Sequence, residues 1–359
     1  MKPSGGLDRG LRPRGSNHAG MAQFNERVVL QAIRQNGSVS KADIARLTSL
    51  TPQTIQIIIA RLEGEGLVHK LEPQRGKVGQ PSVPMALNPD GAFSIGIKIG
   101  RRSLDMLLLD FAGRVRQRSA LGYAFPDPDE LFGQIKTGLR QLTQSLPVKL
   151  RPRLHGVGIA APLSLGGWQA LLGIPAKQAE KWARIDIRGR VAAMTELPVG
   201  FVKDTAAACV AELVAGRGRS IRSFLYVFVD TFIGGGIQPL RLKPRLEVEQ
   251  RGLAQELHGR LALPRLREAG PAVAFAVNSA ACLLDLDGVI IDGSFSRELL
   301  AATLDSVNHA LDDYNWEGVA RPVVLEGTIG SDARAIGGAL LPLYANFAPD
   351  RELFLKLAG

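Results

Sequence analysis

Cysteine is scarce in this chain, which has only two among its 359 residues, Cys209 and Cys282. Two cysteines are too few for a disulfide framework or a cysteine-rich zinc site, and they suit a reducing compartment. No uninterrupted apolar run reaches the roughly 18 residues that a membrane span needs, and the N-terminus lacks the apolar core of a signal peptide. We therefore expect a soluble cytoplasmic protein with no membrane partner and no bound metal.

The composition that remains is that of a large, basic, globular protein. With 45% hydrophobic residues the chain can bury a sizeable core, and its length allows two or three domains. Its formal net charge of +10 and its pI of about 9.9 favour a polyanionic partner, because clustered basic side chains release counterions when they neutralise phosphates. Many basic proteins bind no nucleic acid, so charge alone does not establish this partner.

Residues 1–20 mix Gly, Pro, Arg and Ser and contain almost no apolar side chains. Such a segment cannot offset the entropy of ordering, and we expect a disordered basic tail. The tail is either a simple solvated extension or a contact to DNA phosphates, and Met21 offers an alternative start.

Residues 21–90 carry the pattern of a winged helix-turn-helix. Apolar residues at helical spacing predict a first helix over 25–34. Ser40, with Asp43 three residues later, forms a variant capping box that begins a second helix. Thr51 is a good N-cap for a third helix, with Pro52 at the first helical position, where its missing N–H costs nothing.

The N-terminal turn of the third helix exposes side chains that suit the major groove. Gln53 and Gln56 can each bond N6 and N7 of adenine, and Thr54 can bond a base edge or touch a thymine methyl group. The alternative is a three-helix structural or protein-binding module with a polar surface.

A basic, glycine-rich hairpin follows and favours DNA binding over that alternative. Residues 67–71 and 82–87 predict paired strands, and residues 74–81 form the tip between them. A tip of this kind can approach a phosphate or the minor groove closely. The residues that we expect at the DNA are Ser40, Thr51, Gln53, Thr54, Gln56, Arg61, Arg75, Lys77 and Gln80.

Beyond residue 88 the pattern changes to alternating strands and helices, which predicts an α/β domain. Strands are expected at 93–100, 104–111 and 155–162, with a helix at 129–145, and a second set begins at 224–229. Further on we expect helices at 272–284, 296–314 and 333–345 and strands at 288–291 and 321–325.

Several motifs of this body, taken in order, resemble the ROK family of bacterial repressors, open reading frames and sugar kinases. They are Ile95-Gly96-Ile97-Lys98-Ile99-Gly100, residues 156–162 (GVGIAAP), Trp182, residues 203–208 (KDTAAA) with Glu212, residues 233–237 (IGGGI) and residues 332–339 (DARAIGGA). The resemblance implies an actin-like (ribonuclease H-like) two-lobed kinase fold over residues 91–359, behind the winged helix-turn-helix.

The chain departs from the kinases of this family at its nucleotide motifs. The resemblance places Lys98 where those kinases have an aspartate that manages metal and phosphate, and a lysine cannot hold magnesium. In the second phosphate loop Asp230 would repel a polyphosphate and Phe232 would crowd it, and Asp292-Gly293-Ser294 replaces a glycine-rich turn near the adenosine site. We therefore expect no nucleotide cofactor and no catalysis.

The resemblance assigns Asp204 to the catalytic base position, which is vestigial without a phosphoryl donor. Asp204 then either bonds a sugar hydroxyl or caps the helix that follows. Lys203 replaces the usual asparagine, either as a simple surface lysine or because the ligand is an acidic or phosphorylated sugar. The candidate ligand-binding residues are Lys203, Asp204, Glu212, Gly235 and Gly236.

Two further departures concern a missing loop and the third helix. After Ile237 the chain lacks the Glu-x-x-Gly-His segment and the cysteine-rich zinc loop of many members, and His258 matches only loosely. Either a deletion or a divergent lineage explains this. Ile57 stands where family members often have a basic residue, which shifts phosphate contacts to Arg61 and the hairpin tip.

Together these patterns predict a homodimeric DNA-binding regulator, a repressor, that reads a double-stranded operator and senses a sugar or sugar phosphate through its degenerate kinase-like body. The alternatives are an ATP-dependent sugar kinase with an added DNA-binding head and a scaffold that has lost its ligand.

Overall fold

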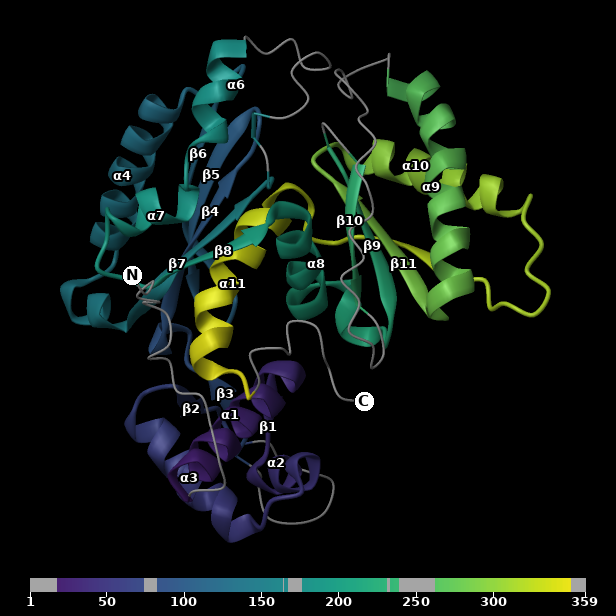
Figure 1. Ribbon diagram of the computed structural model, residues 1–359. Helices are drawn as coiled ribbons and strands as arrows, with labels where there is room; N and C mark the ends of the chain where they lie inside the picture. The colour runs from purple at the N-terminus through teal and green to yellow at the C-terminus, as the bar shows by residue number, and fades with distance from the viewer. Residues whose placement is uncertain are drawn as a thin grey trace, which may run out of the picture.

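The computed structural model describes residues 18–73, 83–163, 165–166, 176–230, 233–238 and 262–349 (Figure 1). Within these ranges the chain forms one sheet of three strands, one of five and one of four. They belong to an N-terminal head and to two lobes of a larger body, so the expected α/β fold behind a winged helix-turn-helix is confirmed. No helix in the described ranges is long and apolar enough to cross a membrane.

The head contains three helices and a small antiparallel sheet in the order β1-β3-β2. Its elements are α1 (His18–Asn36), β1 (Ser38–Val39), α2 (Lys41–Thr48), α3 (Pro52–Gly64), β2 (Val68–Lys70) and β3 (Met85–Leu87), followed by the short helix η1 (Pro89–Gly91). The expected pair of wing strands is confirmed, and β1 adds a third strand.

The first helix begins earlier than its apolar spacing indicates. Helix α1 starts at His18 instead of near residue 25, so residues 18–20 of the expected disordered tail are helical. Ala19, Met21 and Ala22 are good helix formers, which allows the helix to extend beyond its apolar stripe. Residues 1–17 lie outside the described part of the chain.

Side-chain caps start the other two helices, as the sequence predicts. The Ser40 hydroxyl accepts the Asp43 N–H at 3.1 Å, and the Thr51 hydroxyl accepts the Thr54 N–H at 3.2 Å. The apolar face of α3 then packs into the head. Its buried residues are Ile55, Ile58, Ile59 and Leu62.

The first lobe (residues 93–203) contains the five-stranded sheet, in the order β6-β5-β4-β7-β8. Its strands are β4 (Phe93–Ile99), β5 (Ser103–Asp110), β6 (Val115–Gly122), β7 (Leu154–Ala161) and β8 (Val199–Lys203). Strands β4, β5 and β6 are antiparallel neighbours, whereas β7 and β8 run parallel to β4. The helices α4 (Pro128–Ser145), α6 (Ala176–Ala183), α7 (Ile187–Ala192) and η2 (Val148–Arg153) belong to this lobe.

The second lobe contains the four-stranded sheet, in the order β10-β9-β11-β12. Its elements are β9 (Phe224–Val229), β10 (Ile233–Gln238), α9 (Ala262–Leu284), β11 (Gly288–Gly293), α10 (Arg297–Leu311) and β12 (Val323–Glu326). Strand β10 pairs antiparallel with β9, and β11 lies parallel to both β9 and β12. The resemblance places a second phosphate loop over residues 230–236, and the glycines of this segment lie in β10.

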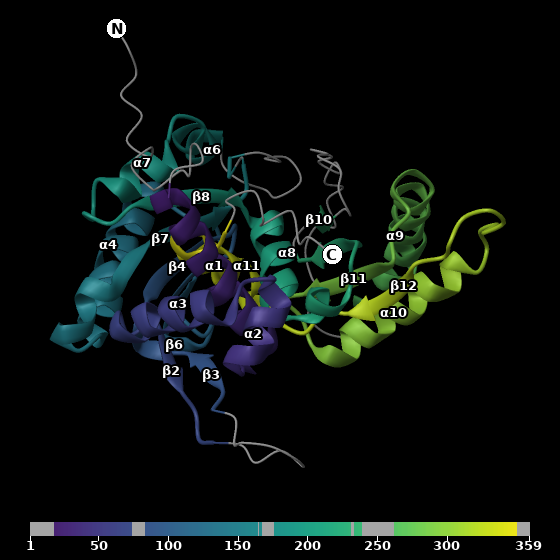
Figure 2. The same cartoon turned by 90° about the horizontal axis from the view of Figure 1, so that it is seen from below.

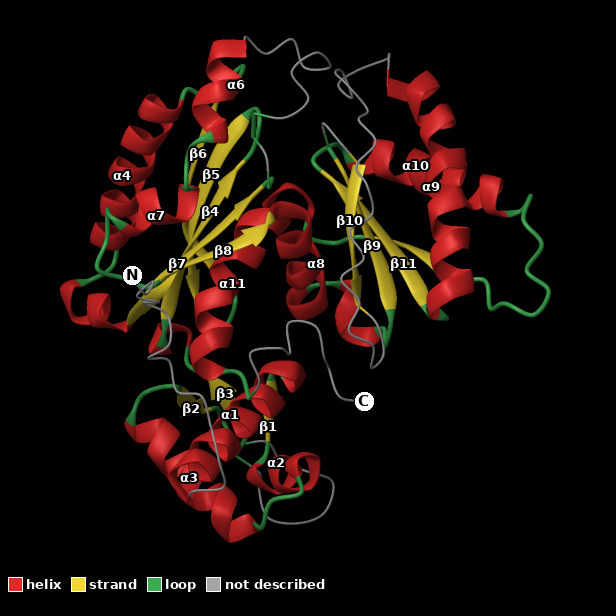
Figure 3. Cartoon of the chain, viewed as in Figure 1, coloured by secondary structure: helices red, strands yellow, loops and turns green. Residues whose placement is uncertain are grey.

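Two helices, α8 (Asp204–Ala215) and α11 (Ala333–Phe347), lie between the sheets (Figure 3). Helix α11 packs against β4, β7 and α8. The backbones approach so closely that a Cβ atom at Gly96 would overlap the carbonyl oxygen of Ala335, and one at Gly158 would overlap that of Gly338. These contacts give a physical reason for the glycines of the sequence motifs. The short helices η3 (Arg217–Ser220) and η4 (Gly330–Asp332) follow α8 and precede α11.

Candidate DNA interface and ligand site

The outward face of α3 lies at the end of the molecule farthest from the two lobes, where Figure 2 shows the head from below. Gln53, Gln56, Ile57, Ala60 and Arg61 are exposed along this helix. The structure thus places both predicted adenine-reading glutamines on the surface of one helix.

The hydroxyl groups among the predicted DNA contacts already have partners within the head. Ser40 accepts the Asp43 N–H and donates to the Asp43 carboxylate at 2.7 Å. The hydroxyls of Thr51 and Thr54 share a hydrogen bond of 2.9 Å, and Thr54 is half-buried. These side chains hold the helix ends in place, which is a structural role that the sequence also indicated through their capping positions.

Arg61 is placed differently from the expectation that it carries much of the phosphate contact. Its guanidinium pairs with Glu26 at 2.9 Å and with Glu65 at 3.0 Å. The hydrogen bond to Glu65 and the charge of Glu26 raise the pKa of Arg61. Because its charge is compensated inside the head, Arg61 is a weaker candidate for a phosphate contact than its sequence position suggests.

The other predicted contacts belong to the wing tip. Strands β2 and β3 pair from Val68 opposite Leu87 to Lys70 opposite Met85, and they lead into the tip. Arg75, Lys77 and Gln80 lie outside the described residues, so their contacts stay predictions.

The head is joined to the body by a continuous buried core and by several arginines. The core runs from α1 through Phe111 of the first lobe to Tyr344 of α11. The Arg34 guanidinium lies over the rings of Phe111 and Tyr344, at 5.2 and 4.9 Å from their centres. Arg27 donates to the carbonyl oxygen of Ala348, and Arg153 of η2 donates to that of Gly66. The C-terminal end of α11 is therefore part of the base on which the head sits.

The opposite end of α11 meets the candidate ligand site through Arg334, which the sequence motif included without a role. This buried guanidinium lies 2.5 Å from Asp230 and 3.9 Å from Asp204, and it donates to the Ser294 hydroxyl at 3.0 Å. It also lies over the ring of Phe228. Burial lowers the pKa of Arg334, but the charges of Asp230 and Asp204 outweigh that effect and raise it. In the sequence, a single arginine within a helix of small apolar residues is the signal that could have indicated a buried carboxylate partner.

Asp204 therefore has a cation as its neighbour. It is the first residue of α8, and its carboxylate accepts the N–H of Thr205. Lys203 occupies the cap position of α8 but makes no side-chain cap hydrogen bond. Asp204 is therefore not the N-cap residue one position before the helix. It lies inside the first turn of α8, beside Arg334.

Lys98 is buried. Its ammonium donates to the Ser103 hydroxyl at 2.5 Å and pairs with Asp105 at 2.8 Å. Burial and the nearby charge of Arg334 lower the pKa of Lys98, and burial lowers that of Arg101, which lies in the field of Asp204 and Asp230. Cations thus surround the carboxylates of this site.

This arrangement does not fit the magnesium–nucleotide complex that the family's kinases bind. A metal ion at Asp204 or Asp230 would have to displace Arg334, and burying an additional charge is costly. Among the residues that the structure describes, no group of three or more His, Cys, Asp or Glu side chains is arranged to hold a metal. Phe232 lies outside the described part of the chain.

Glu212 and Asp292 serve the fold. Glu212 is fully buried, and its carboxylate accepts the N–H groups of Arg217, Thr328 and Ile329, so the described fold already uses both of its oxygens. Asp292 accepts the N–H of Gly330 at 2.7 Å, and burial raises its pKa. The Asp292 carboxylate therefore bonds the backbone of η4.

The two candidate glycines of the ligand site lie within β10. Gly235 is opposite Val227 and Gly236 is opposite Tyr226 in the antiparallel pairing with β9. A Cβ atom at Gly236 would press on the side chain of Cys209 in α8. Close packing accounts for this glycine without a ligand. The basic segment from 239 to 261, with His258, lies outside the described residues.

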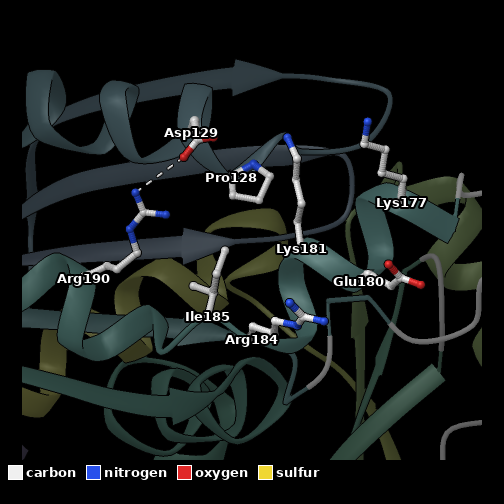
Figure 4. A pocket seen from close by; sticks show the side chains of 8 residues that line it. All are labelled: Pro128, Asp129, Lys177, Glu180, Lys181, Arg184, Ile185 and Arg190. Carbon is white, nitrogen blue, oxygen red and sulfur yellow. Dashed lines mark ion pairs between the residues drawn. The ribbon is translucent and has the colours of Figure 1, made fainter.

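A separate open pocket of about 380 Å³ lies between the start of α4 and the helices α6 and α7 (Figure 4). Much of its charge is internally paired, because Arg190 lies 3.6 Å from Asp129 and Lys181 lies 2.8 Å from Asp127. Figure 1 places α6 at the end of the body opposite the head, so this pocket is far from the face of α3.

Comparisons with known proteins match both parts of the chain. A model of the ROK family matches residues 94–240, and a model described as winged helix-turn-helix DNA-binding matches residues 25–69. The xylose repressor of Bacillus subtilis (strain 168) is 25% identical over 219 residues, which are 60% of this chain and 55% of that protein. The DNA-binding transcriptional repressor Mlc of Escherichia coli (strain K12) is 25% identical over 217 residues, 60% of this chain and 53% of that protein. The chain spans about half the length of the curated relatives it matches.

Solved structures share the fold. A ROK family transcriptional regulator described as a homolog of E. coli MLC superposes with a TM-score of 0.61 at 17% identity, covering 93% of this chain and 99% of that one. A ROK family glucokinase from Streptomyces griseus, in complex with glucose and AMPPNP, superposes with a TM-score of 0.52 at 16% identity, covering 70% of this chain and 99% of that one.

Proposed function

The chain carries a ROK family domain behind a winged helix-turn-helix, and from this premise we propose that it is a DNA-binding transcriptional repressor whose kinase-like body performs no phosphoryl transfer. The observation that carries the proposal is the outward face of α3, which presents Gln53 and Gln56 beside a wing. The xylose repressor and Mlc, which this chain resembles, are repressors by name.

We propose a division of roles within the head. Gln53 and Gln56 read adenines in the major groove through paired hydrogen bonds. Arg75, Lys77 and Gln80 at the wing tip, with the basic tail, supply phosphate contacts, because Arg61 is already paired with Glu26 and Glu65. The protein acts in the cytoplasm as a homodimer on an operator with two half-sites.

The loss of catalysis follows from the charges at the former phosphate site. Arg334 neutralises Asp204 and Asp230, and Lys98 occupies the position where the family's kinases have an aspartate. A body of this kind is suited to sensing. We propose a sugar or sugar phosphate as its effector, with Lys203 and Asp204 as contacts, and helix α11 connects this site to the base of the head.

A band-shift assay with DNA from upstream of the gene tests the proposal. The full-length protein should bind one fragment more tightly than random DNA, and its affinity should fall as salt rises. Gln53→Ala and Gln56→Ala should each weaken specific binding about 5–50-fold, on the order of 1–2 kcal/mol, and leave binding to random DNA nearly unchanged.

The matched control is Gln134→Ala, since Gln134 is exposed on α4 of the first lobe and far from the head. Equal losses on specific and random DNA would contradict base reading by α3, and the absence of any salt-sensitive specific complex would reject the repressor function. An ATP-dependent sugar kinase with a DNA-binding head is the second candidate, because Asp204 is retained at the family's base position. This second candidate requires ADP formation that disappears when Asp204 is replaced.

A further inference from the structure

The residue of interest is Ile57, whose side chain is 66% exposed on the DNA-facing helix α3. The other isoleucines of this helix, Ile55, Ile58 and Ile59, are buried in the head core. Ile57 follows Gln53 by one helical turn and precedes Ala60 by three residues. Residues three and four apart are neighbours on a helix surface, so Ile57 lies in the middle of the face that carries the glutamines.

The surroundings of Ile57 are neutral, which suits bases more than phosphates. The basic side chain of the next turn, Arg61, points its charge to Glu26 and Glu65. The centre of the exposed face of α3 therefore offers the side-chain amides of Gln53 and Gln56 and the branched apolar side chain of Ile57. In the major groove the apolar group that a base pair displays is the C5-methyl of thymine.

We propose that Ile57 contacts the methyl group of a thymine in the major groove and so determines specificity at that base pair. This inference rests on the proposed DNA-binding function. Side chains four residues apart on a helix are about 6 Å apart, and successive base pairs rise about 3.4 Å. The thymine therefore lies within two base pairs of the base that Gln53 contacts, in a half-site rich in A·T pairs.

The experiment removes the methyl group from DNA without changing its hydrogen-bonding edges. Full-length protein first selects its preferred duplex from a random library, and each thymine of that duplex is then replaced singly by deoxyuridine. One replacement in each half-site should weaken binding of the unmodified protein about fourfold, the effect expected for one buried methyl group. The same replacement should have no effect on Ile57→Ala.

Leu47→Ala is the matched control, because Leu47 is a second exposed apolar residue of the head, on α2, with 52% of its side chain exposed. This variant should keep the sensitivity to deoxyuridine. Ile57 is exposed and alanine favours helices, so Ile57→Ala should fold normally.

Four results would overturn the inference. If a preferred duplex is selected but no deoxyuridine weakens binding, or if Ile57→Ala shows the same loss as the unmodified protein, thymine reading by Ile57 is wrong while the DNA-binding function stands. If Ile57→Ala instead dissociates an oligomer in sedimentation while keeping deoxyuridine sensitivity, Ile57 is a contact between copies of the chain. If no sequence is enriched at all, the proposed function itself fails.

Discussion

The guanidinium of Arg334 lies 2.5 Å from the carboxylate of Asp230, joining the start of α11 to the end of the central strand β9. The same guanidinium lies 3.9 Å from Asp204, which follows the edge strand β8 of the other sheet. One buried cation thus connects elements of the two lobes. The stability of the body should depend on this arginine.

We predict that Arg334→Met lowers the free energy of unfolding by about 3 kcal/mol. This is the lower end of the loss expected when one partner of a buried ion pair is removed, because Asp230 is partly exposed. Urea denaturation followed by circular dichroism measures this. The double variant Arg334→Met with Asp230→Asn should lose less than the single variant, since it leaves one fewer uncompensated carboxylate. Arg222→Met, which breaks an exposed pair with Asp287, should cost less than about 1 kcal/mol. Equal losses for Arg334→Met and Arg222→Met would show that the buried cluster adds no stability.

A second prediction concerns catalysis. Incubation with magnesium, ATP and a panel of hexoses and N-acetylhexosamines should release no ADP above the background of the Asp204→Asn variant. The reason is that Arg334 already pairs with Asp204 at the proposed base position, and that Lys98 stands where the resemblance places the aspartate that manages metal and phosphate. A coupled ADP assay measures this, and turnover that disappears in Asp204→Asn would establish a kinase.

Docking of the head onto the body should depend on Arg34. Its guanidinium lies over Phe111 of the first lobe and Tyr344 of α11, and each such contact contributes about 0.5–2 kcal/mol. Arg34→Ala should lower the free energy of unfolding by about 1–2 kcal/mol and speed hydrogen exchange in α1 and at the end of α11. Arg46→Ala, on the exposed surface of α2, is the control and should change neither quantity. Unchanged exchange in Arg34→Ala would mean that the apolar core alone holds the head.

Stability should fall on mild acidification because of His155. Burial, together with the positive charge of Arg153, lowers the pKa of this histidine, whose ring packs edge-on against Phe347. The unfolded chain then binds a proton more readily than the folded one below the ordinary histidine pKa of about 6.5. The contribution of neutral His155 to the free energy of unfolding is complete above that pH. It is lost as the pH falls towards the lowered pKa that His155 has in the folded chain.

Thermal unfolding of His155→Gln between pH 5 and pH 8 checks this expectation. The variant should show a shallower decline on the acid side than the unmodified protein. His309→Gln, in which an exposed histidine of α10 is replaced, should leave the profile unchanged. Parallel profiles for all three proteins would exclude His155 as the source.

The helix caps of the head should affect stability without affecting sequence preference. Thr51→Ala removes the acceptor for the Thr54 N–H and should cost about 1 kcal/mol, and Thr51→Ser should restore most of it. Affinity for the operator and for random DNA should fall by the same factor in Thr51→Ala. A loss confined to the operator would make Thr51 a base contact instead of a cap.

Much of the head could be predicted because its signals are local. The caps at Ser40 and Thr51 and the buried stripe of α3 each depend on residues within one or two turns. Strand β1 could not be predicted, since two residues show no alternating pattern and pairing with β3 is a tertiary contact. Strand β10 was missed for another reason, because three consecutive glycines disfavour a strand unless close packing requires them.

The candidate site was only partly predictable. The family resemblance assigned Asp204 to the base position and identified Asp230 and Lys98 as departures, but it gave no partner for any of them. The partners, Arg334 and Asp105, are fixed by the packing of α11 and by the pairing of β4 with β5. The family resemblance also suggested Glu212 as a ligand contact. The three backbone N–H groups that its carboxylate accepts could not be predicted, because only the fold brings their segments together.

The glycine contacts of α11 restrict how this molecule can move. Gly337 lies so close to the backbone of Ala207, and Gly338 to that of Gly158, that a side chain at either position would force α11 away from α8 or β7. This helix of 15 residues, about 22 Å long, contacts the head near its C-terminal end through Tyr344 and the carboxylates of Asp204 and Asp230 near its start through Arg334. We therefore expect a rearrangement around Arg334 to move the four-stranded sheet more readily than it moves α11.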